Sequence, residues 1–499
     1  MKKIKFKIKP SWVIPFLLLV VLIFLLPLFF INKNDYKNIS TYKMELSYDD
    51  TSHILRGEEE ICYYNNSENL FTYLYFHLYP NAFREGSKSP VVASTKKEEA
   101  YPSGESYGKI EILSVSGKNG DLIYEITGED KNILAIKLEE EIYPDECTVI
   151  NIEFETTLAN INHRLGYGEN TTNIGNFYPI ACVYEDGKGF SQSLYHSNGD
   201  PFYSDCANYE VKISFDSKFN IASSGDLKNS SQSGDVQTNI YKGENIRDFC
   251  MVLSEKFASK SRKVGDVEVN YFGYQGDNDL DECLQVAVDA LQTFNEMFGN
   301  YPYKQLSVVK SNFIHGGMEY PNIVLISDKV EGEDYNYVIV HEIAHEWWYA
   351  VVGNDEYNHA WQDEGLAEYS TLLFFKKNPS YGEDFKKLID GANSSYKLFE
   401  EIFIRVQGEV DGRMERPLCE FETEPEYVQC TYTKGVLLFN NINDLIGEKK
   451  FFKALREYYQ DFMFKNAKPE DLIAKFVDMG GQKTENIFNS WLNGKVIFK

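Results

Sequence analysis

The chain has 499 residues, of which 43% are hydrophobic and 25% are charged, and its formal net charge is −26 at neutral pH. This composition excludes an intrinsically disordered chain and suffices for about two to four folded domains. The acidic balance argues against nucleic acid as a partner, because the phosphate backbone would be repelled.

The first predicted element is a membrane-spanning helix over residues 12–31. Five lysines precede it, and Trp12–Ile31 runs for twenty residues without a charge. A helix of that length spans about 30 Å, the thickness of a bilayer core. Because positive charges stay on the cytoplasmic side, residues 1–11 are predicted to form a cytoplasmic basic stub, with everything after Asn32 outside the cell.

A secretory signal peptide is the alternative for this segment. Its apolar region would be shorter, about 7 to 15 residues, and would be followed by small residues at a cleavage site. The stretch from Phe29 to Lys33 offers none. We therefore expect an uncleaved anchor and a single-pass protein of the cell membrane.

Residues 32–257 have the pattern of a β-rich domain. Short alternating runs, such as 42–48, 70–78 and 208–215, are separated by Gly, Asn and Ser. Two stretches rich in Lys, Glu, Gly and Ser predict long loops, Ser87–Gly108 and Lys228–Gln237.

Residues 258–499 are predicted to be mainly helical. Helices are expected over Asp279–Gly299, Asp334–Val352, Trp361–Lys377, 469–479 and 485–492, with strands over 306–309 and 323–326. The fold class is therefore α+β and multidomain, with a β-rich N-terminal domain followed by a mainly helical domain, behind one transmembrane helix.

The sequence His341-Glu342-Ile343-Ala344-His345 lies on the helix expected at 334–352. Histidines four residues apart share a helix face and reach one cation, and the next helix would bring Glu364 back towards them. Two His and one carboxylate leave the fourth tetrahedral position of zinc open for water, whose pKa the cation lowers to about 7. The motif therefore predicts one zinc per chain, with Glu342 beside it as general base. The alternative is a chance match on a solvated helix face, and the distant Glu364 makes it much rarer.

Two further motifs are Gly316-Gly317-Met318-Glu319-Tyr320 and Tyr432-Thr433-Lys434-Gly435. With the zinc motif, they make the chain resemble the gluzincin aminopeptidases, the family of aminopeptidase N and the leukotriene-A hydrolases. The resemblance covers about residues 38–499 and implies a saddle-like β domain followed by a thermolysin-like zinc peptidase domain. It is a short form, lacking the large C-terminal helical domain of many relatives, so the site is expected to be more open.

The resemblance also implies roles for these motifs. Glu319 would bind the α-amine of a peptide by a charge-assisted hydrogen bond, and Gly316, Gly317 and Met318 would contact its backbone. Tyr432 would stabilise the oxyanion of the tetrahedral intermediate. The alternatives are a turn for the two glycines, a surface acid for Glu319 and a core aromatic for Tyr432. With 35 Tyr in the chain, Tyr432 alone would favour the structural role, and its place in the motif favours the catalytic one.

The chain departs from the family pattern at four positions. Tyr320 replaces the usual Asn, Gly317 replaces Ala, Asp363 replaces Asn, and Thr371 stands where a second Glu commonly orients a ligating His. Tyr320 and Gly317 would change the rim of the substrate site, so the substrate specificity of the family does not carry over to this chain. Thr371 puts the orientation of that His in doubt.

The sequence thus predicts a membrane-anchored zinc aminopeptidase whose catalytic domain hydrolyses N-terminal residues from peptides outside the cell. An endopeptidase of the same fold is the first alternative, although it would not need Glu319. A catalytically silent peptide-binding or scaffold protein is the second, although it could lose Glu342 without penalty. The eight cysteines form no Cys-x-x-Cys pair and read as small buried residues; Cys419 and Cys430 are the pair closest in sequence, and any disulfide pairing is left open, as is the oligomeric state.

Overall fold

The computed structural model describes residues 38–495. Within that range no helix is both long and apolar enough to span a bilayer, and the predicted anchor at 12–31 lies outside it. Contacts join the described residues from Ser40 onward into one compact unit. The division into domains 32–257 and 258–499 stays a prediction.

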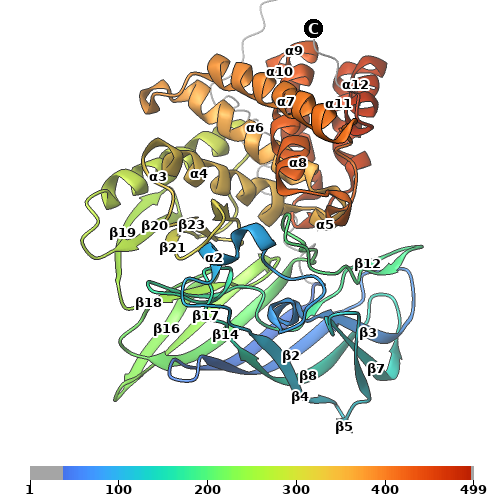
Figure 1. The fold of residues 1–499 in the computed structure, drawn as a ribbon. Helices are drawn as coiled ribbons and strands as arrows, with labels where there is room; N and C mark the ends of the chain where they lie inside the picture. The colour runs from blue at the N-terminus through green and yellow to red at the C-terminus, as the bar shows by residue number, and fades with distance from the viewer. Residues whose placement is uncertain (1–37, 496–499) are drawn as a thin grey trace, which may run out of the picture. The chain divides into compact units, whose positions relative to one another are not determined.

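An eight-stranded sheet forms the base of the β-rich part, in the order β16-β17-β14-β1-β2-β8-β4-β5 (Figure 1). Every second side chain of β1 is buried, because successive side chains of a strand point to opposite faces. Strands β1 and β14 pair in parallel, and the other neighbours pair antiparallel. The strands are β1 Thr41–Asp49, β2 Ile54–Tyr64, β4 Lys109–Gly117, β5 Gly120–Asp121, β8 Cys147–Thr157, β14 Ala207–Asp216, β16 Asp226–Ser233 and β17 Val236–Ile246.

Two four-stranded sheets, β15-β18-β10-β9 and β11-β3-β7-β6, and a small hairpin of β12 and β13 complete the β-rich part. The prediction of a β-rich N-terminal region is confirmed. The strands are β3 Phe71–His77, β6 Tyr124–Thr127, β7 Ile133–Ile142, β9 Leu165–Tyr167, β10 Thr172–Ile174, β11 Ile180–Ala181, β12 Tyr184–Glu185, β13 Gly189–Phe190, β15 Asn220–Ser223 and β18 Met251–Ser254.

One of the two predicted loops is a strand. Lys228–Gln237 lies mostly in β16, at the edge of the large sheet, where it pairs antiparallel with β17. Nearly all of its side chains are exposed, so the sequence does not alternate between apolar and polar residues. The strand is held by backbone hydrogen bonds, which cannot be recognised from the side-chain composition. The other segment, Ser87–Gly108, is irregular except for a 3-10 turn, Ser94–Lys96, and the short helix α2, Lys97–Ala100.

A five-stranded sheet, β19-β20-β21-β23-β22, leads into the helical part. Its strands are β19 Phe257–Val264, β20 Val267–Tyr274, β21 Gln305–Ser311, β22 Gly317–Met318 and β23 Ile323–Ser327. The short strand β22 pairs antiparallel with β23 and lies at the edge of this sheet. Because β22 is the edge strand, the backbone groups on its outer side are not paired with another strand of the sheet.

The helices gather at the opposite end of the unit from the eight-stranded sheet (Figure 1). A mainly helical second part is confirmed. The helices are α3 Leu280–Phe298, α4 Gly332–His345, α5 Glu356–His359, α6 Trp361–Lys377, α7 Phe385–Gln407, α8 Glu424–Val428, α9 Lys434–Ile446, α10 Glu448–Phe462, α11 Pro469–Gly480 and α12 Gln482–Leu492, and two short strands, β24 Val352–Gly353 and β25 Lys465–Asn466, pair among them.

The predicted helix Asp334–Val352 ends earlier than expected. Helix α4 stops at His345, and an irregular turn, Glu346–Val351, follows, in which Trp348 and Tyr349 have non-helical backbone angles. The side chains of Trp347, Trp348 and Tyr349 are all buried. Three consecutive buried aromatic rings cannot share one face of a helix, which explains why the helix ends here.

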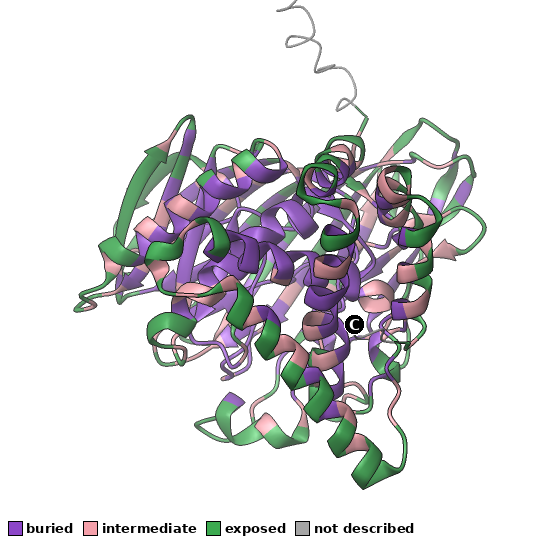
Figure 2. Ribbon diagram, turned by 90° about the horizontal axis from the view of Figure 1, so that it is seen from above, coloured by how far each residue is buried: buried purple, intermediate pink, exposed green. Residues whose placement is uncertain are grey.

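Buried residues concentrate between the elements, and the outward faces of the surface helices are exposed (Figure 2). All eight cysteines are unpaired. The prediction that they are buried is correct for five of them, including Cys430, but it is wrong for Cys147 and Cys419, which are exposed, and for Cys62, which is partly exposed. The core therefore holds α4, α6 and α9 against one another without covalent cross-links.

Candidate active site

The three predicted zinc ligands meet at one point between α4 and α6. His341 Nε2 and His345 Nε2 are 3.2 Å apart, His345 Nε2 lies 3.2 Å from Glu364 Oε2, and His341 Nε2 lies 3.3 Å from the same oxygen. All three residues are buried. Burial opposes ionisation of Glu364, but the imidazoles outweigh it and lower its pKa to about 2, so this ligand is a carboxylate.

These separations fit zinc. In a tetrahedral site with metal–ligand distances of about 2.0 to 2.1 Å, neighbouring ligand atoms are about 3.3 to 3.4 Å apart. Imidazole nitrogen and carboxylate oxygen are also common zinc donors. The donor set therefore fits one zinc ion, with three protein ligands and one open position.

Each histidine is oriented through its other ring nitrogen. His345 Nδ1 lies 3.2 Å from the carbonyl oxygen of Trp348, which can only accept, so Nδ1 carries the proton. His341 Nδ1 lies 2.8 Å from Glu368 Oε2, and the Tyr337 hydroxyl donates to Glu368 Oε1 over 2.6 Å. Both arrangements leave Nε2 as the lone-pair donor for a metal.

Thr371 takes no part in orienting the ligands. Its hydroxyl donates to the carbonyl oxygen of Ala367 within α6, at 2.9 Å. Glu368, one helical turn after Glu364, instead approaches His341. The expected weakness at position 371 is therefore compensated by a carboxylate three residues earlier.

Glu342 faces the cavity from α4, one residue after His341. Its side chain is 5% exposed, and its Oε2 has no hydrogen-bond partner among the described residues. Burial raises the pKa of Glu342 to about 7, against the lowering effect of His341 and His345. A carboxylate in this position can accept a proton and return it.

Gly317 lies against the side chain of Glu342. A Cβ atom at position 317 would overlap the carboxyl group of Glu342, whereas one at Gly316 would only make ordinary contact with Val338. With the usual Ala at position 317, the side chain of Glu342 would have to shift. Gly317 also lies on the edge strand β22, next to the cavity.

Glu319 projects into the cavity just after β22. It is 4% exposed and its Oε1 has no partner among the described residues. Burial raises its pKa well above the usual range, and the carboxylates of Asp200, Glu342 and Glu364 add to this effect. An unpaired carboxyl group among other acids is a receptor for a cation.

The neighbours of Glu319 do not line the cavity. Met318 is fully buried in the core, so any contact that it makes with a substrate must come from its backbone. Tyr320 is also fully buried, and its hydroxyl donates to Asn176 Oδ1 over 2.5 Å. The expectation that Tyr320 shapes the rim is wrong, because the ring ties β22 to the β-rich part instead.

Tyr432 reaches the ligand cluster from the turn before α9. Its hydroxyl donates to Glu364 Oε1. The approach depends on two glycines, since a Cβ at Gly435 would lie 2.5 Å from the Cα of Gly365. The Tyr-x-Lys-Gly motif thus places the phenol by allowing α9 to pack closely against α6.

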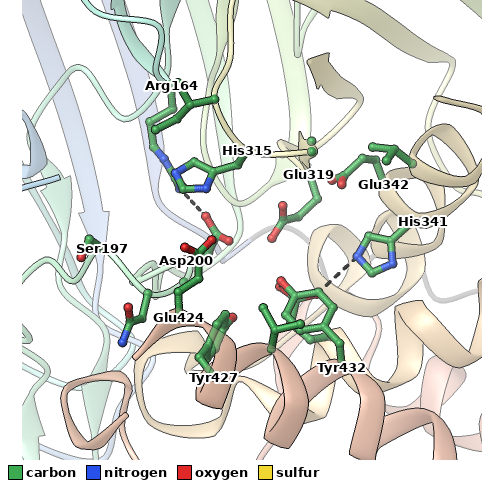
Figure 3. Close-up of a pocket in the computed structure, with 18 of the residues that line it drawn as sticks. Arg164, Ser197, Asp200, His315, Glu319, His341, Glu342, Glu424, Tyr427 and Tyr432 are labelled. Atoms are coloured by element: carbon green, nitrogen blue, oxygen red, sulfur yellow. Dashed lines mark hydrogen bonds and ion pairs between the residues drawn. The ribbon is translucent and has the colours of Figure 1, made fainter. Parts of the chain in front are cut away.

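These side chains share one cavity of about 320 Å³ (Figure 3). Figure 3 shows His341 and Glu342 on one side, Arg164 and Ser197 on the other, and Glu319 and Asp200 between them. Asp200 forms an ion pair with Arg164, whose side chain is 5% exposed. The β-rich part therefore supplies one side of the cavity wall.

Sequence reasoning missed the residues that the β-rich part contributes. Arg164 and Asp200 stand in irregular segments without a motif, and only the fold brings them to the zinc ligands. Glu368 could have been found, because it lies four residues after Glu364 on the same helix face.

Comparison with known families gives a match to the peptidase family M1 domain over residues 282–491. Aminopeptidase M1-D of Oryza sativa subsp. japonica is 25% identical over 229 residues, which cover 42% of this chain and 25% of the rice protein. Endoplasmic reticulum aminopeptidase 2 of Homo sapiens is 27% identical over 217 residues, covering 39% of this chain and 21% of the human protein. The chain thus spans about a quarter of the length of these curated relatives.

Among solved structures, the M1 zinc metallopeptidase from Deinococcus radiodurans superposes with a TM-score of 0.66 at 15% identity, over 93% of this chain and 95% of that one. A mutant of that protein has been solved with a Tyr-Ser-Ala substrate. At this identity the likeness establishes the fold. The family match itself covers residues 282–491, which contain the ligand helices α4 and α6.

Proposed function

We propose that this protein is a zinc-dependent aminopeptidase that removes N-terminal residues from peptides. The observation that carries the proposal is Glu319, a buried carboxyl group with an unpartnered oxygen in the same cavity as the zinc-type ligands. An endopeptidase has no use for a cation receptor one residue from the scissile bond. The names of the relatives, which are aminopeptidases, agree with this reading.

His341, His345 and Glu364 would hold the metal. Zinc bound there supplies a Lewis acid that activates water and polarises a carbonyl group. Glu342 takes a proton from the attacking water and returns it to the leaving amine. Tyr432 turns its hydroxyl from Glu364 to the carbonyl oxygen of the scissile bond, where negative charge develops.

The substrate backbone is held by the edge of the five-stranded sheet. Gly317 belongs to β22, whose outer side pairs with no other strand of that sheet, and an extended peptide can add there as a further strand. The α-ammonium group then meets Glu319, with Asp200 beside it. This fixes the register, so that the first peptide bond lies at the zinc ligands.

The placement outside the cell is part of the same proposal. It rests on the apolar segment 12–31 and the lysines before it, which would anchor the chain with its N-terminus in the cytoplasm. Protease added to intact cells should release an active fragment that lacks about the first thirty residues. If the catalytic part were cleaved only after the cells are lysed, it would lie inside the cell, and the opposite orientation would be correct.

The test of the activity compares aminoacyl fluorogenic amides and short peptides with the same compounds acetylated at the N-terminus. The parent enzyme should cleave only the free amines efficiently. Glu319→Ala should lower kcat/KM for free amines by about 10- to 200-fold, because a hydrogen bond to a charged group contributes about 1.5 to 3 kcal/mol. Equal cleavage of blocked and free peptides would favour an endopeptidase, and no cleavage by zinc-loaded protein would favour a silent binding protein.

A further inference from the structure

The β-rich part and the helical part also meet at the end of the cavity away from the zinc ligands. Lys96 Nζ lies 2.6 Å from Glu424 Oε1, and these residues are 328 positions apart in the sequence. Lys96 ends the turn before α2, and Glu424 begins α8. Both line the cavity, and their side chains are 28% and 35% exposed, so the pair stands where the cavity meets solvent.

Two further contacts join the β-rich part to the helical part. Asn198 Nδ2 donates to the carbonyl oxygen of Phe421 over 2.9 Å. Gly199 approaches Tyr427 so closely that a Cβ at position 199 would lie 2.6 Å from the phenolic oxygen. We call these three contacts, Lys96–Glu424, Asn198–Phe421 and Gly199–Tyr427, the seam.

The seam lies on the amino-terminal side of the proposed substrate. In Figure 3, Ser197, Glu424 and Asp200 lie on one side of Glu319, and His341 and Glu342 lie on the other. A peptide whose ammonium group meets Glu319 has its scissile bond towards the zinc ligands. Any residue added before its N-terminus would have to pass towards the seam.

The space there is small. The whole cavity measures about 320 Å³, at the lower end of the range for small-ligand pockets. Its back wall is filled by His163 and Arg164 of the β-rich part and by His315, whose ring lies edge-on to that of His163 at 5.4 Å. This wall and Glu319 line the same cavity.

We propose that the seam limits the substrate to a single residue before the scissile bond, and that the Lys96–Glu424 ion pair closes its outer end. The inference rests on the proposed aminopeptidase function and names the residues that determine its exopeptidase register. Glu319 attracts the amine, but only a closed wall excludes longer peptides. The pair is thus a specificity determinant outside the three sequence motifs.

The ion pair can be changed without endangering the fold. Partly exposed ion pairs contribute little to stability, and neither side chain is in the core. Lys96→Glu places two carboxylates at the outer end of the seam and should open it by repulsion. Lys96→Glu combined with Glu424→Lys restores the attraction in the opposite sense, and Lys96→Ala removes bulk without repulsion.

The neighbouring ion pair provides a matched control. Lys97 Nζ lies 3.0 Å from Glu105 Oε1, with side chains 45% and 49% exposed, and neither residue lines the cavity. Lys97→Glu makes the same change of charge one residue away. It alters the overall electrostatic field as much as Lys96→Glu does, but leaves the seam intact.

The experiment measures by mass spectrometry the products released from an unblocked heptapeptide by zinc-loaded protein. The parent and Lys97→Glu should release single residues, with little N-terminal dipeptide. Lys96→Glu and Lys96→Ala should raise the ratio of dipeptide to single residues at least tenfold, and the charge swap should bring it back to within about twofold of the parent.

The outcomes separate this inference from the proposed function. A parent protein that releases no single residues contradicts the function itself. A parent that does so, with an unchanged product ratio in Lys96→Glu and Lys96→Ala, overturns the inference alone. An equal rise in Lys97→Glu would also overturn it, because the effect would then come from net charge and not from the seam.

Discussion

The Nδ1 atom of His341 lies 2.8 Å from Oε2 of Glu368, on the side of the ring opposite to the nitrogen that meets His345 and Glu364. The hydroxyl of Tyr337 holds the other oxygen of Glu368. The carboxylate of Glu368 thus lies between the phenol of Tyr337 and the outer nitrogen of the His341 imidazole. Such outer contacts set ring orientation and tune affinity for the metal.

Replacing Glu368 with Ala should therefore weaken zinc binding by about 10- to 100-fold. Competition with a chelator of known affinity measures this directly. Thr371→Ala is the matched control, because Thr371 lies three residues later on α6 and bonds only within its own helix. Equal zinc affinity in Glu368→Ala and the parent would show that Glu368 does not orient the ligand.

Replacing His345 with Ala should remove both metal and activity. His345 is 1% exposed, and its Nε2 lies next to both His341 and Glu364. Without it, only two protein ligands remain, which are too few to hold the zinc. Metal analysis should find close to one zinc per parent chain and almost none in the variant. His359→Ala is the control, since His359 pairs with Glu415 outside the cavity. An unchanged zinc content in His345→Ala would show that His345 is not a zinc ligand.

The zinc cluster was predictable because its geometry is local. Histidines at positions 341 and 345 must share a helix face, and α6 begins and ends at the predicted residues, Trp361 and Lys377, which returns Glu364 to them. The break after His345 was not predictable from periodicity. It follows from the packing of three adjacent aromatic rings in different directions, which depends on tertiary contacts.

The opposite wall of the cavity shows the limit of sequence reasoning. Lys96, Arg164, Asp200 and Glu424 come from four distant segments without periodic pattern, and each has an ordinary surface composition around it. They come together only because the β-rich part packs next to α8 in the folded protein. Likewise, β16 could not be recognised, because an edge strand with exposed side chains has the composition of a loop.

Glu342→Gln should keep the fold and the zinc but lose most of the turnover. The amide has the same shape but cannot accept a proton from water. The parent should therefore exceed the variant by several orders of magnitude in kcat, while both contain the same zinc and unfold at similar temperatures. If the kcat of the variant were near that of the parent, the general base would be a group other than Glu342.

The last prediction concerns stability and pH at Asp248, away from the zinc ligands. Its carboxyl group is 1% exposed, and Oδ2 accepts hydrogen bonds from Asn176 Nδ2 at 3.1 Å and from the Tyr349 hydroxyl at 3.4 Å. Burial raises the pKa of Asp248 from 3.8 to about 7, although these hydrogen bonds and Arg247 oppose the shift. The folded protein therefore binds this proton more tightly than the unfolded chain.

The sign of the effect follows from that difference. Stability from this group is fully present below pH 3.8 and is lost as the pH rises through about 7. Between these values the free energy of unfolding should fall by about 1.4 kcal/mol per pH unit on account of Asp248. Asp248→Asn removes the titration, so its stability relative to the parent should be higher at pH 8 than at pH 5. Chemical denaturation at the two pH values measures this, with Asp121→Asn on the exposed strand β5 as control. Parallel pH dependence in parent and Asp248→Asn would mean that Asp248 is already ionised in the folded protein.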